Sequence, residues 1–268
     1  MTAAATPDAM PPENIYGHRG RLEWIAARLP RDASAVEIGC GTGLMVTAPL
    51  VRLGFRVRGC DLDEESIAYG RRHLAAAGEE SDLVVFGESA CLGDGHGAVI
   101  ASEVLEHIPD DQLAEFLAAA RARLRPGGVL LVTVPNGYGW FEIESALFTR
   151  LRFLAGWLRR LGLAGRIARS KEAVLGQGLT PDFASTLSSS PHVQRFTWWS
   201  IRRLLAAHGF AVEACQGSVL VAGPVSNLLL TGITPVMRFN AWLGRLLPWF
   251  ASGFYLACRR TPDAVERG

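Results

Sequence analysis

Residues 36–43 read VEIGCGTG, and this stretch decides the fold of the chain. Its apolar start predicts a buried strand over 35–38, which runs directly into three glycines at alternate positions. Glycine adopts positive φ at no steric cost and has no Cβ, so the backbone of such a turn can approach a ligand closely. We expect a helix over 43–53, with Pro49 inside it, whose first N–H groups face the same ligand. The stretch therefore predicts a ligand-binding turn between a strand and a helix.

Strands and helices alternate on both sides of this turn. Short apolar and β-branched runs predict further strands at 55–60, 83–86, 98–101, 129–134, 210–214 and 254–258. Apolar residues at helical spacing predict helices at 18–29, 64–77, 110–124 and 197–208. Alternation of this kind favours an α/β fold, in which a mostly parallel, seven-stranded sheet has helices on both faces. Ligands of such sheets bind beyond the carboxyl ends of the strands.

The spacing of the glycines separates two classes of cofactor. A dinucleotide fingerprint needs a third glycine at position 44, but Leu44 stands there and the glycine comes one residue early, at Gly43. This departure disfavours a nicotinamide-dependent oxidoreductase, which we keep as an alternative. Asp61 follows the second strand, and its carboxylate can accept hydrogen bonds from ribose hydroxyls. Nicotinamide and adenosyl cofactors both carry a ribose, so Asp61 alone does not discriminate between them.

Four segments together resemble the class I S-adenosylmethionine-dependent methyltransferases, within the branch of the ubiquinone-type O-methyltransferases. They read EIGCGTG at 37–43, GCDLD at 59–63, SEVLEHI at 102–108 and LRPGG at 124–128. The resemblance implies a Rossmann-like fold, S-adenosyl-L-methionine as cofactor, and methyl transfer to a small-molecule or lipid-linked acceptor at an oxygen atom. A non-catalytic cofactor-binding module is a further alternative.

The resemblance also implies a cofactor site at the carboxyl ends of the first four strands, made of Glu37, Gly39, Cys40, Gly41, Gly43, Asp61, Leu62, Glu88, Ser89, Ser102 and Glu103. The three glycines are expected along the methionine and ribose end of the cofactor. Glu37 is expected to hold the glycine loop or the cofactor ammonium, and Asp61 the ribose hydroxyls. Leu62 is expected against the adenine, and Glu88 near its amino group. Ser102 and Glu103 are expected on the methionine and substrate side.

Glu103, Glu106 and His107 are spaced so that they project from one face of a helical turn. Two carboxylates and an imidazole suit a divalent metal such as Mg²⁺, Mn²⁺ or Zn²⁺, and His192 could add a ligand. Some relatives with this pattern resemble metal-assisted O-methyltransferases. Two other interpretations stay open: His107 or His192 acts as a general base, or the turn is only structural.

Composition restricts the remaining function classes. The 268 residues carry a formal net charge of +1, which gives no general attraction to nucleic acid. The five cysteines lack metal-site or redox-motif spacing, which indicates reduced thiols in the cytoplasm. We find no signal peptide and no uninterrupted apolar stretch long enough to span a membrane.

Changes in pattern along the chain predict its organisation. We expect a tail at 1–14, the cofactor-binding core at 15–136, an inserted helical cap at 137–195, and completion of the sheet with an apolar helical insertion at 196–260. Residues 146–171 interleave basic and apolar side chains without any acidic residue, and the apolar C-terminal tail at 219–254 repeats this pattern. Such segments either cover an active site or make peripheral membrane contact and take up a lipid-like substrate.

Overall fold

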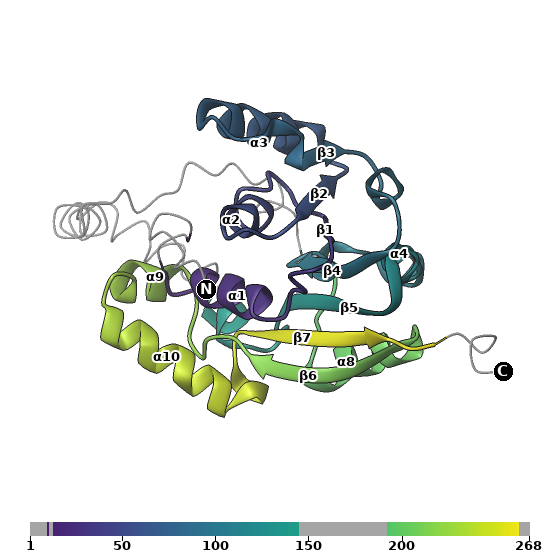
Figure 1. Ribbon diagram of the computed structural model, residues 1–268. Helices are drawn as coiled ribbons and strands as arrows, with labels where there is room; N and C mark the ends of the chain where they lie inside the picture. Colours follow the sequence, from purple (N-terminus) through teal and green to yellow (C-terminus); the bar gives the residue numbers. More distant parts are fainter. Residues whose placement is uncertain (1–9, 11–12, 145–191, 263–268) are drawn as a thin grey trace.

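The computed structural model of the chain describes residues 10, 13–144 and 192–262. Within them lies a seven-stranded sheet in the order β3-β2-β1-β4-β5-β7-β6. β7 is antiparallel to both of its neighbours, and the remaining pairs are parallel (Figure 1). The strands are β1 (Ala35–Ile38), β2 (Val57–Asp61), β3 (Val84–Phe86), β4 (His96–Ser102), β5 (Leu124–Pro135), β6 (Phe210–Gly217) and β7 (Gly253–Arg260).

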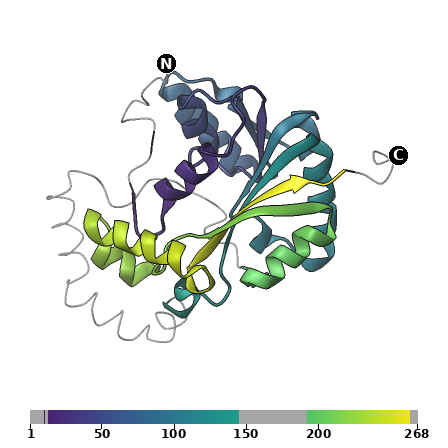
Figure 2. The same ribbon diagram turned by 60° about the horizontal axis from the view of Figure 1, so that its bottom comes forward.

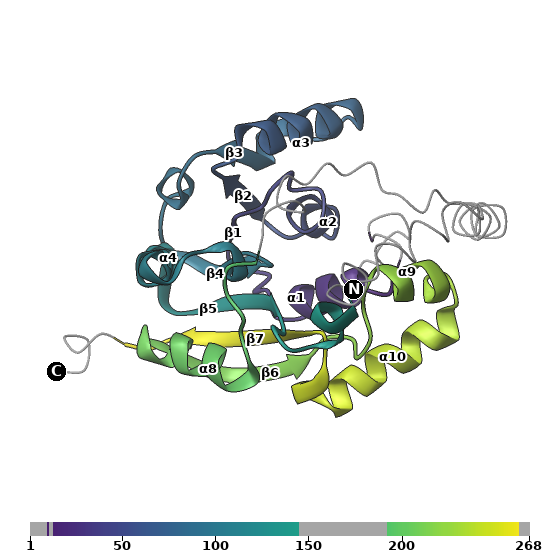
Figure 3. The same cartoon turned by 180° about the vertical axis from the view of Figure 1, so that it is seen from behind.

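Helices cover both faces of this sheet, which confirms the predicted fold class. α1 (His18–Ala26) and α2 (Thr47–Arg52) bury their apolar residues on one face. α4 (Asp110–Arg123) and α8 (Trp198–Ala207) bury theirs on the other, and α8 lies in front of β6 and β7 in the view from behind (Figure 3). α3 (Glu64–Ala76) packs near β3, at the edge of the sheet.

β5 shows why the sheet needs both layers. Val129 and Leu131 face the cluster that contains α1, whereas Leu130 and Val132 face the cluster that contains α4 and α8. Side chains alternate between the two faces of a strand, so a continuous apolar run is buried only when both faces are covered. The order of the strands reverses between β1 and β4, and the residues that follow these two strands therefore border the crevice in which such sheets bind ligands.

The predicted helix over 43–53 is wrong at its start. α2 begins at Thr47, since Gly43 has a φ of +71° and belongs to the turn. The first residues of a helix have N–H groups without an intrahelical partner, so a proline there removes no hydrogen bond. Pro49, the third residue of α2, is accommodated for this reason.

An insertion of helices separates β6 from β7. It contains α9 (Pro224–Leu230), α10 (Thr234–Leu246) and a short 3₁₀ turn, η6 (Pro248–Phe250), and lies to one side of the sheet (Figure 2). Among the described residues, none of the helices combines the length and apolar character needed to cross a bilayer. Most of the cap predicted at 137–195, including the basic segment at 146–171, falls outside the described residues.

Candidate active site

The three glycines of the turn after β1 all have positive φ, between +55° and +76°. A Cβ at Gly43 would lie 2.1 Å from Val84 Cγ1, and one at Gly39 would lie 2.7 Å from Val104 Cγ2. A Cβ at Gly41 would meet nothing within 4 Å. Gly39 and Gly43 are therefore required by packing, whereas Gly41 keeps its surroundings open at the end of the strand.

Asp61 joins this turn to the end of β2. Its Oδ2 accepts a hydrogen bond from the backbone N–H of Gly41 at 2.7 Å, and its Oδ1 accepts one from the N–H of Asp63 at 2.9 Å. These two bonds fix the carboxylate at the mouth of the crevice. A carboxylate oxygen accepts more than one hydrogen bond, so both oxygens retain capacity for a ligand hydroxyl.

Glu37 lies beneath the turn and is buried. The Thr47 hydroxyl, at the first residue of α2, donates to its Oε2 at 2.5 Å. Burial raises the pKa of Glu37 to about 8, and the Thr47 hydrogen bond opposes this shift. The residue therefore ties the end of β1 to the start of α2, on either side of the glycine turn, and its expected role toward the loop or the cofactor ammonium stays a prediction.

The other expected cofactor residues lie around the same crevice. Cys40 is buried within the turn, and the Leu62 side chain, directly after β2, is 71% exposed. Glu88 and Ser89 follow β3 and begin a short 3₁₀ helix. Their contact with a cofactor stays a prediction.

A chain of polar contacts follows β4. The Ser102 hydroxyl lies 3.1 Å from Thr133 Oγ1, which donates to Glu103 Oε1 at 2.8 Å. Arg21, on α1, forms an ion pair with the same Glu103 oxygen at 3.4 Å. Sequence reasoning missed Arg21, because nothing near it in the chain marks it as facing a strand end more than 80 residues away.

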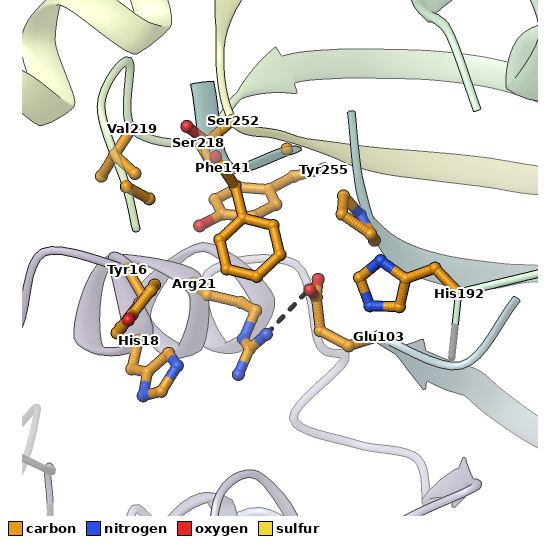
Figure 4. A pocket seen from close by; sticks show the side chains of 13 residues that line it. Tyr16, His18, Arg21, Glu103, Phe141, His192, Ser218, Val219, Ser252 and Tyr255 are labelled. Carbon is orange, nitrogen blue, oxygen red and sulfur yellow. Dashed lines mark ion pairs between the residues drawn. The ribbon is translucent and has the colours of Figure 1, made fainter. Parts of the chain in front are cut away.

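A cavity of about 310 Å³ opens beside Glu103 (Figure 4). Its wall combines residues from α1 and the turn before it, from the end of β5 and the segment after it, from the segment before α8, from the start of β7, and from both ends of the insertion between β6 and β7. The wall includes Tyr16, His18, Phe141, His192, Val219 and Tyr255. Of these six, only His192 was predicted. The others come from segments that no local motif connects.

Two histidines and two glutamates meet at one side of this cavity. His192 lines it, and its Nδ1 lies 3.1 Å from Glu142 Oε1. The rings of His107 and His192 lie edge to face, with centroids 5.1 Å apart. His107 Nε2 lies 3.8 Å from Glu106 Oε1. Burial, and then the charge of Glu103, raise the pKa of Glu106 well above its usual range.

The predicted grouping of Glu103, Glu106 and His107 is only partly right. Glu103 has a φ of +55° and precedes the 3₁₀ turn η4 (Leu105–His107), so its carboxylate turns toward Arg21 and Thr133 instead. Glu106, His107 and His192 do come together, with one potential ligand atom of each within 4.8 Å of the others.

His18, on the opposite wall, was not anticipated. The Nδ1 atom of its ring lies 3.0 Å from the Asn14 side-chain nitrogen. Burial, and then the charge of Arg21, lower the pKa of His18 to about 3. This imidazole is therefore neutral at physiological pH.

The chain matches a known protein family over most of its length. A family model described as a methyltransferase domain matches residues 18–214, and the chain belongs to that family. Its cofactor is S-adenosylmethionine, and the predicted class of enzyme is confirmed: an S-adenosylmethionine-dependent methyltransferase. The nicotinamide-dependent alternative is not favoured.

The curated relatives include ubiquinone biosynthesis O-methyltransferases. The protein of that name from Xanthomonas axonopodis pv. citri (strain 306) is 30% identical in an alignment over 165 residues that covers 53% of this chain and 68% of the relative. The one from Paramagnetospirillum magneticum (strain ATCC 700264 / AMB-1) is 37% identical over 146 residues, which are 54% of this chain and 56% of the relative. The chain spans about half the length of several further relatives of the same name.

Solved structures share the fold at lower sequence identity. Magnesium protoporphyrin IX methyltransferase from Synechocystis PCC 6803, with bound S-adenosylhomocysteine, matches with a TM-score of 0.52 and 16% identity over 91% of this chain and 84% of its own. A methyltransferase from Methanosarcina mazei gives 0.51 and 16% over 90% and 98%. These matches support the fold alone.

Proposed function

We propose that the protein transfers a methyl group from S-adenosylmethionine to a hydroxyl oxygen of a small, lipid-like acceptor bound in the cavity beside Glu103. One observation carries this proposal: the cavity adjoins the end of β4, at the cofactor crevice, and has an imidazole with a carboxylate partner in its wall. The names of the curated relatives support oxygen as the methylated atom.

The cofactor lies across the glycine turn in this proposal. Asp61 takes the ribose hydroxyls, Gly41 leaves room for the nucleoside, and the exposed Leu62 covers the adenine. Arg21 and Glu103 present a positive and a negative group at the methionine end, where the cofactor carries a carboxylate and an ammonium. Opposite charges at close range orient the two groups.

The chemical step needs mainly alignment. The acceptor oxygen forms a bond to the methyl carbon while the bond from that carbon to the sulfonium sulfur breaks, which leaves S-adenosylhomocysteine. The hydroxyl proton passes to a base. Positioning of the two reactants contributes several kcal/mol to such a reaction.

His192 is our candidate for the base, because it lines the cavity whereas His107 lies behind it. Glu142 contacts Nδ1 of His192, which leaves Nε2 to accept the proton. A carboxylate partner of this kind fixes the orientation of an imidazole. Glu142 is therefore a positioning residue.

A metal-assisted reaction is the second candidate, favoured by the cluster of Glu106, His107 and His192. The donor set fits a divalent ion: potential ligand atoms lie within 4.8 Å of one another, and the buried Glu106 Oε2 has no hydrogen-bond partner among the described residues. These three residues would hold the ion, which would polarise the acceptor hydroxyl.

A methyl-transfer assay tests the proposal. The purified protein is incubated with S-adenosylmethionine and a panel of apolar phenols and catechols, and products are analysed by mass spectrometry. We expect methyl ethers from the intact protein, and their formation about 10²–10⁴-fold slower in the His192→Gln variant. Methylation at nitrogen or carbon alone would contradict the choice of atom. Metal analysis before and after chelation distinguishes the two mechanisms, because only the metal-assisted one loses turnover with the ion.

A further inference from the structure

α10 exposes an unusual face to solvent. After Thr234, its exposed positions recur every three or four residues and so lie along one side of the helix: Pro235, Arg238, Phe239, Trp242, Arg245 and Leu246. The helix lies at the periphery of the molecule, beyond β6, in two opposite views (Figures 1 and 3). The 3₁₀ turn η6 continues this face with Trp249 and Phe250.

The inner face of α10 carries the polar group instead. Asn240 is buried, accepts a hydrogen bond from the Val221 N–H at 2.8 Å, and donates one to the Val221 carbonyl at 2.7 Å. At Gly244 a Cβ would lie 2.3 Å from the Ser218 carbonyl oxygen, so the helix lies directly on this backbone. A helix of a globular protein normally turns its apolar stripe inward and its polar side outward. The aromatic residues of α10 instead lie on its exposed side.

The exposed aromatic area is large. Phe239 is 59% exposed, Trp242 54%, Trp249 51% and Phe250 68%, and Phe239 and Trp242 stack with ring centroids 5.6 Å apart. We refer to Arg238, Phe239, Trp242, Arg245, Leu246, Trp249 and Phe250 as the α10 surface. Clustered exposure of this kind marks an interaction site.

The charge of this part of the chain favours an anionic partner. Residues 214–262 contain no aspartate or glutamate. Among the described residues, no carboxylate pairs with Arg238 or Arg245. A second copy of this chain docked through the same segment would offer these arginines no carboxylate, so their charges would stay unneutralised. An anionic partner neutralises them.

We propose that the α10 surface docks on the headgroup region of an anionic lipid bilayer. Tryptophan and phenylalanine on one side of a helix, flanked by arginines, match the composition of helices that lie in the plane of a membrane interface. The aromatic rings enter the boundary between headgroups and acyl chains, and the arginines contact lipid phosphates. The proposal rests on exposure and charge and holds whichever acceptor is methylated.

α10 contacts the segment that forms one wall of the active-site cavity. Ser218, Val219 and Ala222 line the cavity, and α10 holds this same segment through Asn240. A protein docked through α10 therefore has a wall of its cavity next to the bilayer. A lipid-like acceptor then has a short path from the membrane to the site.

Vesicle flotation of the full chain tests the proposal. We expect the protein to float with vesicles of phosphatidylcholine and phosphatidylglycerol and to bind pure phosphatidylcholine vesicles at least tenfold more weakly. Replacing both aromatic residues, Phe239→Ala with Trp242→Ala, should lower the vesicle partition coefficient at least tenfold. Replacing both arginines, Arg238→Gln with Arg245→Gln, should remove most of its dependence on anionic lipid and on salt.

Trp199→Ala is the matched control, since Trp199 is 69% exposed on α8, outside the surface. It should bind vesicles like the unchanged protein. Thermal melting and S-adenosylhomocysteine titration of every variant report folding and the cofactor site independently of lipid, so a failure of methyl transfer is distinguishable from a failure of docking.

Three results would overturn the proposal. The unchanged protein could remain entirely in the soluble fraction, or all variants could float equally, which would place membrane contact elsewhere in the chain. Alternatively, light scattering could show a dimer that the aromatic variant converts to a monomer. The α10 surface would then be an interface between copies.

Discussion

The cofactor side and the acceptor side of this site are built in different ways. The cofactor side consists of loops that follow β1, β2 and β4, and its key contacts involve backbone atoms, such as the Gly41 N–H that donates to Asp61. The acceptor side consists of side chains from segments as distant as Tyr16 and Tyr255. Short motifs encode the first, and only the folded sheet assembles the second. The two sides should therefore respond independently to substitution.

His192→Gln is expected to give the largest effect, and to change the acceptor side without changing the cofactor side. Loss of a general base typically costs about 10²–10⁴-fold in turnover. We expect this loss in kcat with unchanged affinity for S-adenosylhomocysteine. Glu142→Gln should give a smaller loss of kcat, because it affects only the orientation of the imidazole. An equal loss of cofactor affinity in either variant would mean that the two sides are not independent.

Two glycine substitutions sharpen the comparison within the cofactor side. Gly43→Ala places a Cβ 2.1 Å from Val84 Cγ1 at a φ of +71°, and should destabilise the protein by about 3 kcal/mol. Gly41→Ala has open space around its Cβ, and only backbone strain remains, about 1 kcal/mol. Gly41→Ala should nevertheless weaken cofactor binding strongly, since its methyl group occupies the crevice. Chemical denaturation and calorimetry measure the two effects; equal stability losses would contradict the packing difference.

The smallest expected effect concerns Glu37 and pH. The pKa of this carboxyl is about 8 in the folded protein against 4.5 ordinarily, so the folded state holds the proton more tightly. Its contribution to stability is full below about pH 4.5 and is lost as the pH rises to about 8. Glu37→Gln, which remains neutral, should therefore lose less stability than the unchanged protein across this range. If the melting temperatures of the unchanged protein and of Glu37→Gln changed equally with pH, Glu37 would not titrate in this range.

The sequence predicted a mostly parallel, seven-stranded sheet and the position of its glycine turn, because strands, helices and turns depend on local pattern; the order of the strands came only from the structure. The predicted start of α2 was too early. Gly43 has a positive φ and still belongs to the turn, and nothing in the sequence distinguishes it from the first residue of a helix. Sequence reasoning missed Arg21, His18 and Tyr255, which reach the site only after α1 and β7 pack onto one face of the sheet. It also grouped Glu103 with Glu106 by helical spacing, and a single residue at positive φ separates them.

Calorimetric titration with S-adenosylhomocysteine tests the division of the site most directly. The unchanged protein, His192→Gln, Asp61→Asn and the control Asp63→Asn are each titrated, with NAD as the competing cofactor class. We predict tight binding of S-adenosylhomocysteine to the unchanged protein, to His192→Gln and to Asp63→Asn. Asp61→Asn should lose about tenfold or more in affinity, because its charge-assisted hydrogen bonds disappear. NAD should not bind. Equal binding to Asp61→Asn would contradict the assignment of the crevice between β1 and β4 as the cofactor site.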